Sequence, residues 1–147
     1  MQAVVLLSIM LVGCATTSLN QAELAKVQTQ ILNTSDKDAV FSTAVNVLQD
    51  WGYMVEDANT ELGFVSASKD VTLEGGQAVL AAGLLGVDGV THVAKLNVSK
   101  RDTTCHVRLT FNSIFKDING RATKTSPVRE ADPYNQFFTA LRQALGI

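Results

Sequence analysis

Apolar and polar residues follow two different periods along this chain. Every second residue is apolar in the segments 26–32, 92–100 and 105–111, which predicts β-strands with one buried face. Apolar residues instead recur every three to four positions over 36–51, and again from Asp132 to the C-terminus. That spacing predicts two amphipathic helices.

Both helices carry signals for their ends. Ser35 is expected to cap the helix at 36–51, and Gly52 to end it, because glycine readily adopts the left-handed conformation after a helix. For the C-terminal helix, Asp132 is expected to be the N-cap. Pro133 then occupies the first turn, where its missing N–H is not needed.

A hairpin is expected directly after the first helix. The strands 53–56 and 64–69 flank a run of turn-forming residues at 57–63, whereas the polar run 116–131 is expected to be a loop or an irregular edge. The order is therefore strand, helix, strand pair, insert, strand pair and helix. This order indicates an α+β fold, with an antiparallel sheet and two helices packed on one face.

The insert at 73–90, with the sequence LEGGQAVLAAGLLGVDGV, fits neither period. Its apolar part is too short to cross a bilayer, which takes about 20 residues. We expect a short helix or long loop packed on the domain, with a disordered flap as another reading. A third reading is an element that touches lipid headgroups or a partner protein, with Leu80, Leu84 and Leu85 as the contact residues.

The N-terminus has the pattern of a leader. Residues 3–12 form an uncharged apolar run of the length found in signal peptides. The basic residue that usually stands between the initiator methionine and this run is missing here. The run ends in Leu-Val-Gly13-Cys14, which resembles the bacterial lipobox. That resemblance implies cleavage between Gly13 and Cys14, and a diacylglycerol on the Cys14 sulfur.

The lipobox divides the chain into three parts. We expect a signal peptide at 1–13, the lipidated cysteine with its tether at 14–25, and a single α+β domain at 26–147. Several acyl chains on one residue are enough for stable membrane anchoring. Ala15, rather than aspartate, follows the cysteine. By the sorting rule of enterobacterial lipoproteins, this residue implies a periplasm-facing position on the inner leaflet of the outer membrane.

Charge and cysteine content narrow the possible partners. The net charge is −2, so the chain has neither the basic footprint of a nucleic-acid binder nor a polybasic patch for anionic lipids. The two cysteines do not look like a disulfide pair, because Cys14 closes the leader and Cys105 lies in an alternating strand. We expect Cys105 to be buried.

The residues with catalytic potential do not form a convincing set. Ser66 and Lys69 match the S-x-x-K pattern of penicillin-recognising enzymes, but they fall in a predicted strand, and the run 124–126 (KTS) breaks the K-T-G pattern that accompanies it. His92 and His106 lack the spacing of a metal site. We therefore expect a protein that is not an enzyme and that holds no cofactor or metal.

Three motifs carry a wider resemblance. The helix end 48–52 (LQDWG), the strand end 67–69 (ASK) and the run 134–138 (YNQFF) are similar to a family of uncharacterised Gram-negative outer-membrane lipoproteins. The similarity covers most of the chain after the leader. The chain departs from the family pattern at Lys26, where arginine is usual, and at Trp51, where leucine is commoner.

These features predict an adaptor or accessory subunit of an envelope protein complex. It would bind another envelope protein, whose identity stays open, through a sheet edge or through 73–90. The alternative is a binder of a lipid or small apolar ligand, held between the helix at 36–51 and the sheet. A filled core with an exposed apolar patch in 73–90 would favour the adaptor. The ligand alternative would be favoured by a large apolar pocket lined by Phe41, Val45, Leu48 and Phe138.

Overall fold

The computed structural model describes residues 18–72 and 86–147 as an α+β domain. Cys14 and the residues 73–85 of the insert lie outside the described part. The elements, in chain order, are α1 (Gln21–Gln28), β1 (Thr29–Leu32), α2 (Lys37–Asp50), β2 (Met54–Asn59), β3 (Phe64–Val71), β4 (Gly89–Arg101), β5 (Thr104–Lys116), β6 (Ala122–Pro127) and α4 (Asp132–Leu145).

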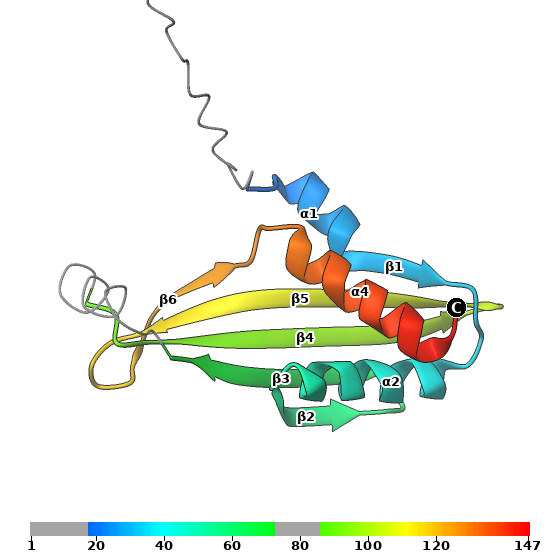
Figure 1. The fold of residues 1–147 in the computed structure, drawn as a ribbon, viewed down its shortest axis with the longest axis horizontal. Helices are drawn as coiled ribbons and strands as arrows, with labels where there is room; N and C mark the ends of the chain where they lie inside the picture. Colours follow the sequence, from blue (N-terminus) through cyan, green and yellow to red (C-terminus); the bar gives the residue numbers. More distant parts are fainter. Residues whose placement is uncertain (1–17, 73–85) are drawn as a thin grey trace, which may run out of the picture.

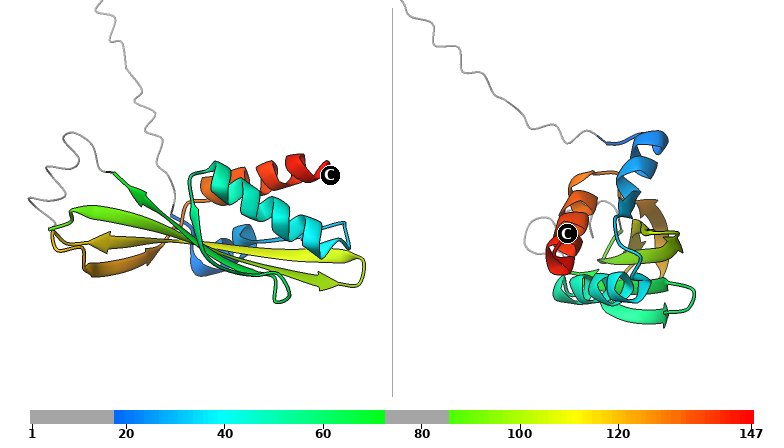
Figure 2. Two further views of the ribbon diagram at one scale, coloured as in Figure 1. Left: turned by 90° about the horizontal axis from the view of Figure 1, so that it is seen from below. Right: turned by 90° about the vertical axis from the view of Figure 1, so that its right-hand side faces the viewer.

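The six strands form one antiparallel sheet in the order β1-β5-β4-β3-β2, and β6 also pairs with β5. The long β4–β5 hairpin forms its centre, with paired residues from Gly89 opposite Lys116 to Arg101 opposite Thr104. The helices α2 and α4 run in opposite directions across one face of the sheet (Figures 1 and 2). This arrangement confirms the expected fold class.

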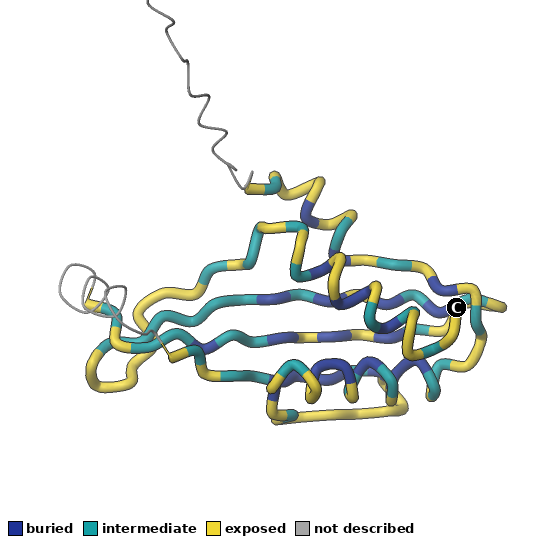
Figure 3. Tube along the Cα trace, viewed as in Figure 1, coloured by how far each residue is buried: buried dark blue, intermediate teal, exposed yellow. Residues whose placement is uncertain are grey.

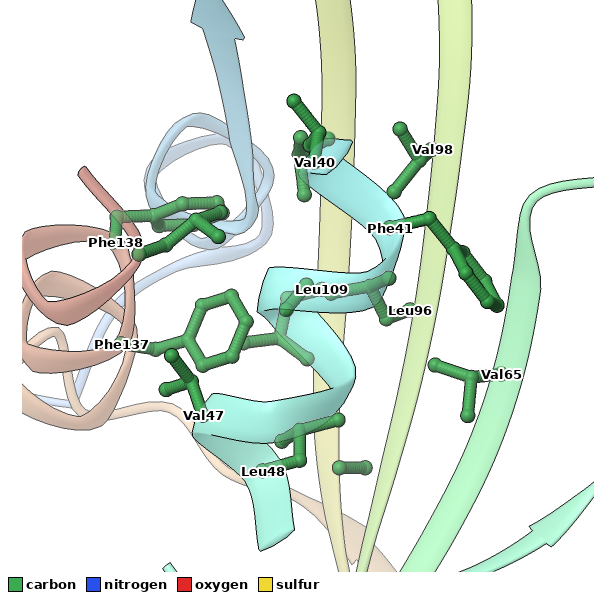
Figure 4. Close-up of a cluster of buried hydrophobic side chains, with 14 of the residues drawn as sticks. Val40, Phe41, Val47, Leu48, Val65, Leu96, Val98, Leu109, Phe137 and Phe138 are labelled. Carbon is green, nitrogen blue, oxygen red and sulfur yellow. The ribbon is translucent and has the colours of Figure 1, made fainter. Parts of the chain in front are cut away.

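The core lies between these two helices and the sheet, because the predicted alternation places every second strand residue on the covered face. Burial is concentrated beneath the helices (Figure 3). Figure 4 shows the large side chains that meet there. Burying one such side chain contributes about 1.5–3 kcal/mol to stability. The core residues, all at most 6% exposed, include Val40, Phe41, Leu48, Val65, Leu96, Val98, Leu109, Phe137 and Phe138.

The start of the domain differs from the prediction. The strand expected at 26–32 begins only at Thr29, and the residues before it belong to α1. The cause is a capping box: the Asn20 side chain accepts hydrogen bonds from the N–H groups of Ala22 and Glu23, while Glu23 accepts one from the Asn20 N–H. Residues 21–25, expected as tether, are therefore helical.

Gly52 follows the C-cap of α2 with a φ of +82°, as expected, but the two expected N-caps are each wrong by one residue. The N-cap of α2 is Asp36, not Ser35, and its carboxylate accepts a hydrogen bond from the Ala39 N–H at 2.9 Å. The N-cap of α4 is Ala131, so Asp132 is the first residue of the helix, and its side chain does not cap it.

Further boundaries need correction. The insert expected at 73–90 ends before Gly89, because β4 already begins there. The second strand continues through the expected turn to Asn59, with a register shift between Val55 and Asp57. The polar run 116–131, expected to be a loop or an irregular edge, contains β6, an edge strand whose exposed residues give no alternating pattern. The segments β2 and β6 are edge strands, in which one or both faces are exposed to solvent. The alternation of apolar and polar residues is therefore a weak signal for them.

Gly63 closes the β2–β3 turn, and the backbone geometry at this position requires a glycine. Its φ is +69°, its carbonyl accepts the Val98 N–H at 2.7 Å, and a Cβ at this position would lie 2.0 Å from the Val98 carbonyl oxygen. Gly120, in the β5–β6 turn, has a similar φ of +73° but open space around it. A comparison of substitutions at Gly63 and Gly120 therefore separates the cost of backbone strain from the cost of close packing.

We predict that Gly63→Ala lowers the free energy of unfolding by about 3 kcal/mol or more, because a backbone clash adds to the left-handed strain. Gly120→Ala carries the strain alone and should cost about 1 kcal/mol. Urea unfolding followed by Trp51 fluorescence measures both values. Equal losses in the two variants would refute the packing role of Gly63.

Candidate functional site

The residues predicted to carry function lie outside the described part of the chain. These are the lipidation and cleavage residues Gly13 and Cys14, and the contact residues Leu80, Leu84 and Leu85. The lipid anchor and the partner contact in the insert therefore remain predictions.

The interior beneath α2 is filled. Leu48 and Phe138 are 0% and 2% exposed, so they pack into the core and do not line a space with Phe41 and Val45. Phe41 and Val45 instead contribute to an open groove of about 670 Å³ between α2 and the end of β2. The pocket expected for an internal ligand is thus not formed by these four residues.

The strand β2 forms one free edge of the sheet. Its inner side pairs with β3, and all of its residues except the half-buried Val55 are exposed (Figures 1 and 3). Apolar side chains stand at both ends: Met54 is 74% exposed and Leu62, just beyond the strand, is 71% exposed. Such an edge offers unpaired backbone N–H and C=O groups to another strand.

The β2 edge is only lightly protected. Glu56 and Asp57 place negative charge at the register shift, and the Glu56 carboxylate accepts a hydrogen bond from the Ser68 hydroxyl on the neighbouring strand. Bulges and charges are common devices that discourage indiscriminate pairing at an edge. The same two carboxylates disfavour antiparallel pairing of β2 with a second copy of itself, because like charges would face each other.

The S-x-x-K pair is not assembled. Successive strand residues point to opposite faces, so Ser66 lies on the face away from the helices and Lys69 on the helix-covered face. The Lys69 ammonium donates a hydrogen bond to the Trp51 carbonyl oxygen at 3.0 Å, at the C-terminal end of α2. A lysine there satisfies a free helix carbonyl and complements the helix dipole.

Cys105 is buried, as expected, and is a free thiol. Burial raises the pKa of the Cys105 thiol, which keeps it protonated and unreactive. His106 points to the opposite face from Cys105, and His92 lies on the same face as Lys69 near the other end of the sheet. The two histidines therefore do not meet.

Within residues 18–72 and 86–147, no group of three or more histidine, cysteine, aspartate and glutamate side chains is placed to hold a metal ion. No helix in these ranges is both long and apolar enough to cross a membrane. The one ion pair found among the described residues joins Lys116 and Asp70 at 3.3 Å. With the Thr91 hydroxyl and Lys116 beside it, the pKa of Asp70 lies below its usual value.

The sequence suggests a sheet edge as the partner-binding surface but does not show which strand forms it. The residues Asp57, Ala58 and Asn59 were assigned to a turn because they are turn formers, and the irregular pairing at Glu56 hides the strand period. The length of the segment 54–59 is the feature of the sequence that still indicated a strand. The run from Met54 to Asn59 is long enough to pair along most of β3.

Comparisons with known proteins assign this chain to no family. The chain matches no family model and no curated protein. Among solved structures, it is similar to a crystal structure described as a DUF4468 family protein from Bacteroides ovatus. The TM-score is 0.46 and the identity 9%, over 81% of this chain and 85% of that chain. At this identity the likeness says nothing about activity or partners.

We predict that the free energy of unfolding decreases as the pH falls from 7.5 to 5. Burial of His92, with repulsion from Lys69, lowers its pKa from 6.5, so the unfolded chain binds a proton more readily than the folded one. The contribution of His92 to the free energy of unfolding is then fully present above about pH 6.5 and decreases as the pH falls below that value.

His92→Gln should flatten this pH dependence, whereas His106→Gln, on the opposite face, should leave it in place. Urea titrations at both pH values measure the effect. An unchanged slope in His92→Gln would show that His92 is not its source.

Proposed function

We propose that this chain is a lipid-anchored, non-catalytic lipoprotein of the Gram-negative cell envelope. It acts as an adaptor or accessory subunit on the periplasmic side of the outer membrane, and it binds its envelope partner through the free edge of β2. The observation that carries the proposal is this exposed strand, with Met54 and Leu62 standing at its two ends.

The position of the chain's entry into the domain supports the proposed anchor geometry. Leu19 is bound to Arg129 in both directions: the Leu19 N–H donates to the Arg129 carbonyl at 2.9 Å, and the Arg129 guanidinium donates to the Leu19 carbonyl at 3.2 Å. From Cys14 to Leu19, five peptide steps reach at most about 18 Å. A lipidated Cys14 would hold this corner of the domain close to the membrane.

The same geometry favours β2 over the opposite edge. In Figure 1, α1 and the short strand β1 lie on the side where the chain enters, whereas β2 is the last strand on the other side. The third edge strand, β6, contains Pro127, which has no N–H to donate, and the exposed Lys124. An extended segment of a periplasmic partner would therefore reach β2 with the least obstruction.

The anchor has a direct test. Cys14→Ser should abolish incorporation of a radiolabelled or alkyne-bearing fatty acid into the protein, because the acylated sulfur and amine belong to this one residue. Cys105→Ser serves as the matched control and should be labelled like the unmodified protein. Continued labelling of the Cys14→Ser variant would rule out the lipoprotein assignment.

The partner edge is tested by a photoreactive amino acid placed at Asp57, with the exposed Gln143 on α4 as the control position. In intact cells, illumination should link the protein to one discrete envelope protein from position 57, with a yield at least several-fold above that from 143. The reason is that a strand added to β2 lies within reach of side chain 57 but not of α4.

The same crosslinking in a chain that lacks 73–90 separates the two predicted contacts. A product that persists in the deletion variant assigns the partner to the β2 edge. Equal yields from the two positions, or products from 143 alone, would contradict edge binding.

A further inference from the structure

A hollow that is independent of the proposed adaptor role lies where the helix layer ends. The C-terminus of α2 and the N-terminus of α4 meet at the same end of the layer, and the sheet continues beyond them without helix cover (Figures 1 and 2). The hollow between them measures about 210 Å³. We call it the Trp51 hollow; its lining residues are Trp51, Tyr53, Lys69, His92, Phe111, Val128, Pro133 and Gln136.

The walls of the Trp51 hollow are aromatic and held in place from behind. Trp51 packs edge-on against the buried Phe137, with ring centroids 5.9 Å apart. Tyr53 packs on Phe111 at 6.0 Å, and Phe111 on Tyr134 at 5.2 Å. The Tyr134 hydroxyl also accepts the Phe111 N–H and donates to the Val128 carbonyl. Tyr53 and Phe111 are only 6% and 3% exposed, so they form the backing of the hollow, and the half-buried Trp51 is the aromatic ring that these contacts preorganise for a ligand.

One cation lies among these aromatic walls. The Lys69 ammonium is 4.8 Å from the centre of the Tyr53 ring and 3.0 Å from the Trp51 carbonyl oxygen. An ammonium has three N–H donors, and the bond to Trp51 uses one of them. Lys69 thus has donors left for an anionic acceptor that enters the hollow.

The other polar groups of the lining do not neutralise Lys69. The eight lining residues include no aspartate or glutamate. Burial raises the pKa of Tyr53 to about 12 and lowers that of His92, so both are uncharged near neutral pH. Asp70, the carboxylate next in sequence to Lys69, points to the opposite face, where it bonds to Thr91 and Lys116. The Trp51 hollow is therefore positive at one point and apolar elsewhere.

We infer that the Trp51 hollow binds a small monocyclic aromatic carboxylate, with its ring against Trp51 and its carboxylate on the Lys69 ammonium. The volume supports a ligand of this size, because it lies below the roughly 300–1,000 Å³ of sites for drug-sized molecules. The interior beneath α2 has no comparable combination of space and charge, since its side chains are packed together.

The test uses the fluorescence of Trp51, which is the single tryptophan of the chain. The full-length protein in detergent is titrated with phenylacetate and, separately, with phenylacetamide, which has the same shape without the charge. Phenylacetate should change the emission saturably, and phenylacetamide should bind at least tenfold more weakly. Free N-acetyl-tryptophanamide in the same detergent supplies the background.

Three variants assign the effect to the proposed contact. Lys69→Met should weaken phenylacetate binding at least tenfold and leave phenylacetamide unchanged, while Lys69→Arg should stay within about threefold of the unmodified protein because it keeps the charge. Lys95→Met removes the same charge from the exposed opposite face and should have no effect.

Circular dichroism shows whether each variant is folded. If Lys69→Met does not fold, the comparison of phenylacetate with phenylacetamide in the unmodified protein and in Lys69→Arg still tests the charge contact, because both proteins should prefer the acid. A response that rises linearly without saturation would overturn the inference. So would equal binding of acid and amide, or equal binding by folded Lys69→Met and the unmodified protein.

Discussion

The packing of α2 and α4 on one face of the β4–β5 hairpin is the interaction on which the rest of the molecule depends. Leu48, Phe137 and Phe138 enter the layer from the helices and meet Leu96 and Leu109 from the sheet, all almost fully buried. Because this layer is filled, binding is left to the outside of the domain. On the described surface, the free β2 edge offers unpaired backbone groups, and the end of the helix layer offers a hollow beside the Lys69 ammonium.

The same packing fixes how the edges of the sheet are used. The chain enters the domain at Leu19, forms α1 and then forms β1, which pairs with β5. The β1 side of the sheet therefore lies beside the proposed membrane anchor. The β2–β3 hairpin closes the other side, held by the tight approach of Gly63 to Val98. A lipid on Cys14 and a partner on β2 would then occupy opposite sides of one rigid domain. That arrangement suits a protein that connects a membrane to a periplasmic component.

The sequence predicts the parts of the fold that are set by burial. The helix stripe containing Leu48 and the alternation around Leu109 are read directly, because each has one dry face. The parts decided by local hydrogen bonds or by edge pairing were missed. The Asn20–Glu23 capping box is a readable signal for α1, whereas β6 has exposed residues on both sides and no period to find.

The candidate sites show the same division. A linear motif such as the one ending in Cys14 can be recognised without a structure, and the S-x-x-K pattern can be recognised and be misleading, since Ser66 and Lys69 lie on opposite faces. The Trp51 hollow could not be predicted from the sequence. Its residues come from the end of one helix, the start of another and three strands, and only the folded chain brings them together.

Amide hydrogen exchange tests the central claim of edge binding most directly. The lipidated protein would be compared in native outer-membrane fragments and after purification in detergent. The account predicts that the backbone of β2 exchanges more slowly in the membrane fragments, because a partner strand supplies hydrogen bonds to its free edge, while β6 exchanges equally in both. Equal exchange of β2 in the two samples, with slowing elsewhere in the domain, would contradict it.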